Sequence, residues 1–299
     1  MNITNGILLK IISTLLFALM SAAIRWIGQS VPLGEVVFFR SAFAIIPIVL
    51  VYAVQGRLWS AFRTKRPLGH VGRGLVGVLG MFLNFAALAR LPLADATVIS
   101  FATPLVTVVL AALVLHEQVR IYRWTAVAVG FLGVIVMLLP YLDLSHLWQR
   151  EAPQQTLGAV MGLVGAICVA GAVVQTRRLT DTETTSAIVL YFSLICAVGG
   201  LLTIPEWSMP DGWQLAALIS IGVLGGVSHI FLTESYRLAP ASVVAPFDYM
   251  SIIWAFVLGY ALFGEMPTRL VFVGALIVTG AGLFVVWREW QLGIERAKV

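Results

Sequence analysis

Hydrophobic residues along the chain fall into long runs, separated by short breaks that contain charged residues, proline or glycine. A helix needs about 20 mostly apolar residues to cross the hydrocarbon core of a bilayer, and these runs have that length. They therefore predict an all-α, polytopic membrane protein. With span ends taken at the breaks, the pattern predicts ten transmembrane helices, over residues 6–27, 35–55, 70–90, 94–115, 121–140, 157–177, 184–204, 213–236, 241–263 and 268–288.

One run occurs twice. The segments PLADATVISFATPLVTVVLAALVLHE (92–117) and PASVVAPFDYMSIIWAFVLGYALFGE (240–265) both extend from proline to glutamate, and they lie 265 − 117 = 148 residues apart. That offset is about half of the 299 residues. Five spans in each half is an odd number, so the second half enters the membrane in the opposite orientation, as in many secondary transporters. The sequence thus predicts two inverted five-helix repeats, residues 1–145 and 146–299.

The composition agrees with a membrane protein, because 60% of residues are hydrophobic, 11% are charged and the mean hydropathy is +0.97. The net charge of +5 does not indicate nucleic-acid binding, since the basic residues lie mainly in short loops. The first run continues to Ile27, which predicts a first helix rather than a cleaved signal peptide.

The orientation follows from lysine and arginine, which concentrate on the cytoplasmic side. With the N-terminus inside, four arginines lie outside (Arg25, Arg90, Arg150 and Arg269) and Arg40 lies within a span. The other fourteen lie inside: Lys10, Arg57, Arg63, Lys65, Arg66, Arg73, Arg120, Arg123, Arg177, Arg178, Arg237, Arg288, Arg296 and Lys298. This predicts a multi-pass protein of the cell inner (plasma) membrane with both termini cytoplasmic.

The paired segments resemble the pattern of the EamA-type branch of the drug/metabolite transporter superfamily: a small residue with an aromatic or leucine, Pro-Ala-Ser, a later proline and a closing Leu-Gly-Glu. The matching residues are Ala87-Leu88, Pro92, Pro104 and His116-Glu117, then Ser235-Tyr236, Pro240-Ala241-Ser242 and Gly264-Glu265. His116 replaces the usual glycine, and Ile252 the usual proline. The resemblance implies a ten-helix, two-bundle fold that works by alternating access. Its members include amino-acid exporters and carriers of nucleobases, riboflavin or S-adenosylmethionine.

Ionisable side chains within spans are costly and so are candidates for function. Arg40 can bind a substrate carboxylate with two parallel hydrogen bonds, or it can be a structural partner of Glu35. Asp248, beside Tyr249, can accept a substrate ammonium or a coupling proton, or it can be a hydrogen-bonded helix contact.

Other polar residues complete the predicted lining of a site between the two halves. The predicted substrate-binding residues are Arg40, Asn84, Ser100, His229, Asp248 and Tyr249, with Glu234 and Asp248 as proton or gate residues. Ser100 shares a face with Thr103 and Thr107, and such hydroxyls more often bond the preceding turn. His229 and Asn84 fit interhelical hydrogen bonds equally well.

Several further residues have structural interpretations. Pro104 and Pro246 predict discontinuities that expose backbone groups or act as hinges. Glu117 and Glu265 at the membrane edge predict helix-end contacts. Small residues at every fourth position, Gly158, Gly162, Ala166 and Ala170, predict close helix packing.

These features predict a secondary transporter that exports small amphipathic metabolites, most simply amino acids including aromatic ones, as monomer or homodimer in lipid. The alternatives are a carrier of riboflavin, nucleobases or a nucleotide-like cofactor, and a lipid flippase. An enzyme is not expected, because no nucleophile and base cluster together and no metal-ligand spacing occurs. GRGLVG (72–77) lies inside a predicted span, so it is not a dinucleotide site, and no cofactor is expected.

Overall fold

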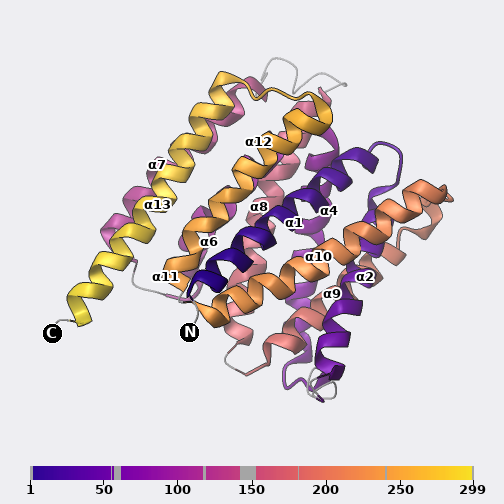
Figure 1. Ribbon diagram of the computed structural model, residues 1–299, viewed down its shortest axis with the longest axis horizontal. Helices are drawn as coiled ribbons and strands as arrows, with labels where there is room; N and C mark the ends of the chain where they lie inside the picture. Colours follow the sequence, from indigo (N-terminus) through magenta and orange to yellow (C-terminus); the bar gives the residue numbers. More distant parts are fainter. Residues whose placement is uncertain are drawn as a thin grey trace.

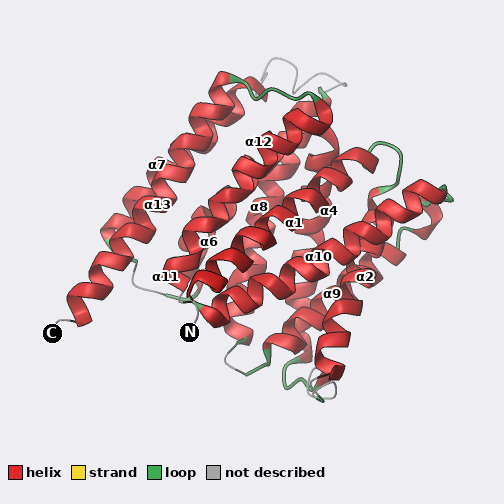
Figure 2. Cartoon of the chain, in the orientation of Figure 1, coloured by secondary structure: helices red, strands yellow, loops and turns green. Residues whose placement is uncertain are grey.

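The computed structural model describes residues 3–54, 56, 62–116, 119–141, 153–180, 182–239 and 241–297. Within these ranges the chain consists of helices joined by short loops, and it contains no strand (Figure 2). The helices are α1 (Ile3–Ile27), α2 (Leu33–Val54), α4 (Pro67–Arg90), α5 (Leu93–Ser100), α6 (Ala102–Val114), α7 (Ile121–Leu138), η1 (Leu139–Tyr141), α8 (Gln154–Leu179), α9 (Thr185–Leu201), η2 (Ile204–Glu206), α10 (Gly212–Leu238), α11 (Ala241–Val244), η3 (Ala245–Tyr249), α12 (Met250–Phe263) and α13 (Arg269–Ala297).

Many of these helices can cross a membrane. Eight helical segments in the described part of the chain are long and apolar enough: 3–27, 67–90, 93–114, 121–141, 154–179, 212–238, 245–263 and 269–291. They fall on predicted runs, and α2 and α9 lie on the predicted runs 35–55 and 184–204. The all-helical, polytopic membrane class predicted from the sequence is therefore confirmed.

Local sequence explains where several helices begin and end. Pro67 is the first residue of α4, where its missing N–H costs nothing. Asp211 and Gln214 form a reciprocal capping box that starts α10. Gly264 ends α12 in the left-handed conformation, with φ of 65°, which glycine adopts without strain.

Two of the membrane segments are broken next to proline. Phe101 separates α5 from α6, three residues before Pro104. Because proline lacks an N–H, the Ser100 carbonyl has no donor four residues later. In the later segment, the 3₁₀ turn η3 contains Pro246 and separates α11 from α12. The predicted discontinuities thus occur beside both prolines, and their role as hinges stays a prediction.

The helices pack as a bundle (Figure 1). Helix α1 packs on α10, α4 packs on α8, and α2 lies against both α9 and α10, while α7 and α13 lie side by side at one edge of the view. On α8, Gly158 and Gly162 are buried against Leu91 and Ile99. A Cβ at Gly158 would lie only 3.0 Å from Leu91, so the small-residue stripe permits close helix contact as predicted.

Candidate functional site

A buried cationic group lies where α2 meets α10. The Arg40 side chain on α2 is 7% exposed, and its Nη2 lies 3.3 Å from Nε2 of His229 on α10. A guanidinium has only donors, so Nε2 must be the acceptor and the neutral ring carries its proton on Nδ1. The edge of the His229 ring in turn contacts Phe17 of α1, with ring centroids 5.0 Å apart.

The charge of Arg40 has no carboxylate partner among the described residues. Its Nε atom is buried and also lacks a hydrogen-bond acceptor within that part of the chain. Glu35, the structural partner considered from the sequence, accepts instead from the backbone N–H of Ser208. An unpaired buried guanidinium in a membrane helix is expensive, and its free donors suit a carboxylate.

A second charged group involves a lysine inside α1. Lys10 is 1% exposed, and its Nζ lies 2.6 Å from Oδ1 of Asp248 in η3. The same Nζ lies 3.2 Å from the Tyr236 hydroxyl and 4.7 Å from the centre of that ring. Asp248 is 46% exposed, so its carboxylate remains open on one side whereas the lysine does not.

Both charged groups lie along the same contact between α1 and α10. Lys10 and Phe17 are seven residues apart on α1, as are His229 and Tyr236 on α10. At 1.5 Å per residue, the two groups are separated by about 10 Å along the helices. Ser13, which lies between Lys10 and Phe17 on α1, donates its hydroxyl to the Ser228 carbonyl of α10 at 2.9 Å. This seam therefore presents two polar centres about 10 Å apart along the helices, a guanidinium with free donors and a carboxylate that is open on one side.

Two predicted substrate-binding residues and one predicted proton or gate residue have local or peripheral partners. Asn84 donates to the Gly80 carbonyl of its own helix at 2.9 Å and packs against Gly165 of α8. The Ser100 hydroxyl donates to the Thr97 carbonyl of its own turn at 2.6 Å. Glu234 is 39% exposed and pairs with an exposed arginine of its own helix at 3.2 Å. None of these three residues belongs to the Arg40–His229 group or to the Lys10–Asp248 group.

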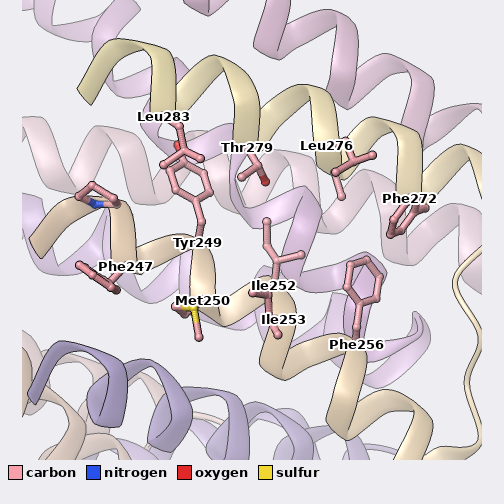
Figure 3. Close-up of a pocket in the computed structure, with 12 residues that line it drawn as sticks. Phe247, Tyr249, Met250, Ile252, Ile253, Phe256, Phe272, Leu276, Thr279 and Leu283 are labelled. Carbon is pink, nitrogen blue, oxygen red and sulfur yellow. The ribbon is translucent and has the colours of Figure 1, made fainter. Parts of the chain in front are cut away.

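Tyr249 belongs to an apolar groove between η3–α12 and α13 (Figure 3). The groove has a volume of about 440 Å³, and none of the described residues that line it is charged. The Tyr249 ring stacks on Phe101 at 5.0 Å, and in Figure 3 it points toward α13 near Leu283. Phe272 and Leu276 in the lining are 50% and 58% exposed, so the groove opens at the outer surface of the bundle. This lining suits hydrocarbon rather than a polar headgroup.

Comparison with known proteins identifies the family. The model of the EamA-like transporter family matches residues 4–139 and again residues 156–287. The chain belongs to the EamA-like transporter family. The resemblance inferred from the paired proline-to-glutamate segments is therefore confirmed, and so is the expectation that the protein is not an enzyme.

Relatives of this EamA-like transporter have several substrates. It is 28% identical over 289 residues to the S-adenosylmethionine uptake transporter of Rickettsia prowazekii, covering 95% of this chain and 93% of that protein. It is 31% identical over 285 residues to the pseudopaline exporter CntI of Pseudomonas aeruginosa, covering 93% and 94%. It is 27% identical over 294 residues to the riboflavin transporter of Vibrio cholerae, covering 96% and 94%. The protein is thus a small-molecule transporter.

A solved crystal structure shares the fold, with a TM-score of 0.66 at 18% identity, covering 94% of this chain and 96% of that one. Because the sequence identity is low, this likeness concerns the fold alone.

Sequence reasoning missed several charged residues of the interior. The charge count assigns Lys10 and Arg73 to the inner side, but both lie within helices, and Arg73 of α4 lies 4.4 Å from the centre of the Phe192 ring. A lysine inside an apolar run was the available signal for Lys10. Glu183 was also missed, although 183 − 35 = 148 relates it to Glu35 by the offset of the paired segments. Glu117 lies outside the described residues.

Glu183 joins two loops. Its Oε1 accepts the backbone N–H groups of Lys65 and Arg66, at 2.7 and 2.9 Å, just before α4 begins. His70 Nε2 lies 3.5 Å from Oε2. Burial alone would raise the pKa of the Glu183 carboxyl. The hydrogen bonds from the Lys65 N–H, His70 and the Arg66 N–H lower it by more, so the pKa lies below its usual value.

Proposed function

We propose that this EamA-family protein is a secondary transporter of amino acids and similar zwitterionic metabolites. The substrate carboxylate binds Arg40 and the cationic group binds Asp248 in successive steps of transport, because the two groups of an α-amino acid are too close together to span both centres at once. The observation that supports this best is the buried Arg40 guanidinium, which has no carboxylate partner among the described residues and leaves Nε without an acceptor. A carboxylate on Arg40 would compensate a charge that the described helices leave unpaired.

The relatives are compatible with this substrate class. S-adenosylmethionine, the substrate named for the Rickettsia prowazekii relative, contains an amino-acid group with both an ammonium and a carboxylate. Riboflavin, named for the Vibrio cholerae relative, has neither group. A protein built for riboflavin would have little use for a buried arginine without a counter-ion, so the arginine favours the amino-acid class.

We propose alternating access between two inverted five-helix halves, the ten-span architecture predicted from the sequence. Three observations support it. The family model matches the chain twice. The packing of α1 on α10 has a counterpart in α4 on α8, as exchange of the halves requires. Both broken segments, 93–114 and 241–263, occupy the corresponding position in each half, and discontinuous helices are typical of transporter sites.

We propose outward transport across the inner membrane. The sequence contains no nucleotide-binding loop of the type G-x-x-x-x-G-K-[ST], so transport must follow a gradient. An uncoupled carrier moves amino acids down their own gradient, which points out of the cell.

Uptake of labelled phenylalanine and threonine into proteoliposomes tests the role of Arg40. Arg237 on α10 has a 75% exposed side chain, and R237A is the matched control. Loss of charged hydrogen bonds of about 1.5–3 kcal/mol predicts roughly a 10- to 100-fold weaker apparent affinity in R40A. R40K should bind more weakly than wild type, since lysine cannot form the bidentate contact. Wild-type affinity in R40A would refute the assignment of the carboxylate to Arg40.

A further inference from the structure

Lys10 is placed where a substrate cation would bind. Its Nζ contacts the Asp248 carboxylate at 2.6 Å and the Tyr236 hydroxyl at 3.2 Å, and it lies over the Tyr236 ring. A carboxylate beside an aromatic face is a favourable environment for an ammonium or sulfonium ion. The lysine therefore makes the contacts that the positive group of a substrate would make.

The three side chains differ in exposure, and this difference determines which of them a ligand can reach. Lys10 is buried, at 1% exposure, whereas Asp248 and Tyr236 are 46% and 42% exposed. A ligand can thus reach the carboxylate and the ring from the open side, and Lys10 approaches them from within the bundle. Asp248 and Tyr236 are accessible to a ligand, and the cation that contacts them in the structure is the protein's own Lys10.

We propose that Asp248 and Tyr236 form a binding site for the cationic group of the substrate, and that Lys10 is a tethered competitor for it. This inference rests on the proposed function for the identity of the substrate. When a substrate ammonium or sulfonium ion binds Asp248, it replaces the Lys10 ammonium there, and Lys10 keeps its hydrogen bond to the Tyr236 hydroxyl. The pair holds the Asp248 carboxylate in place, and it lowers the affinity for ligands that carry a positive group.

The proposal has a consequence for charge selectivity. If the Lys10–Asp248 pair is closed about nine-tenths of the time, it weakens apparent binding of a cation roughly tenfold. Removing Lys10 should therefore strengthen binding of cation-bearing ligands and leave ligands without a positive group unchanged. A lysine that only stabilises the fold would not produce this selectivity.

The first experiment needs no transport. Purified wild type, K10M and K10M/D248N are unfolded thermally in detergent micelles, with methylammonium chloride or sodium chloride at equal ionic strength. Methylammonium should raise the melting temperature of K10M above its value in sodium chloride, but not that of wild type or K10M/D248N. K10R, which keeps the positive charge, should behave as wild type. Equal responses in K10M and K10M/D248N would overturn the proposal.

The second experiment separates this inference from the proposed function. Phenylalanine, phenylalaninamide and N-acetylphenylalanine, which are zwitterion, cation and anion, compete for uptake of labelled phenylalanine. The first two should compete about tenfold better in K10M than in wild type, and the third should not change. Uptake without any such gain would overturn the role of Lys10 and leave the proposed function standing. A methylammonium effect without phenylalanine uptake would retain the cation site and reject the proposed substrate class.

Discussion

Replacing Glu183 with alanine is expected to destabilise the protein strongly, although Glu183 lies outside the membrane spans. The carboxylate is buried and accepts two backbone N–H groups, from Lys65 and Arg66, at 2.7 and 2.9 Å. These donors belong to the turn that begins α4, and Glu183 lies just before α9. The change therefore breaks a link between two loops that are far apart in sequence.

The magnitude follows from the hydrogen bonds. A bond to a charged acceptor contributes about 1.5–3 kcal/mol, but both bonds here share one oxygen and Arg66 is exposed, so E183A should lose about 2–4 kcal/mol. E183Q keeps a neutral acceptor and should lose about 1–2 kcal/mol. For a chain of this size, these losses correspond to a fall in melting temperature of roughly 4–8 °C and 2–4 °C.

Tryptophan fluorescence during thermal unfolding in detergent micelles would measure these shifts. The matched control is E234Q, because Glu234 forms only a surface pair with an exposed arginine, which contributes no more than about 1 kcal/mol. If E183A unfolded at the same temperature as E234Q, the buried loop contact would not stabilise the protein as we infer.

Two further predictions concern pH and helix packing. Because the pKa of folded Glu183 lies below its ordinary value of 4.5, its contribution is complete above pH 4.5 and is lost as pH falls through the lower folded value. The stability difference between wild type and E183Q should therefore shrink below pH 4.5, and a constant difference in denaturant titrations would disagree. A Cβ at Gly282 would overlap the Tyr249 hydroxyl, whereas one at Gly280 would meet no atom within 4 Å. G282A should thus cost about 1–3 kcal/mol of stability and G280A almost none, and equal melting temperatures would contradict this packing.

The helices were predictable because each span is specified by its own apolar length. The breaks at Phe101 and in η3 were predictable in the same way, since Pro104 and Pro246 act on their own turns. These features depend on residues adjacent in the chain, and the structure places them within a few residues of the predicted positions.

Partners across the bundle were not predictable from local sequence. Lys10 and Asp248 are 248 − 10 = 238 residues apart, and neither residue type specifies which helix it faces. Arg40 and His229 were both candidates, but their contact appears only when α2 packs on α10. The repeat offset contained more information, since it relates Glu35 to Glu183, and both accept backbone N–H groups from loops that precede α10 and α4.

Counterflow in proteoliposomes tests the central claim most directly. Vesicles containing the purified protein are loaded with unlabelled amino acids, nucleobases or riboflavin, and entry of labelled phenylalanine or threonine is followed. We predict acceleration by several amino acids in wild type, and its loss in R40A. Acceleration by nucleobases or riboflavin alone would contradict amino-acid transport by this member of the EamA-like family.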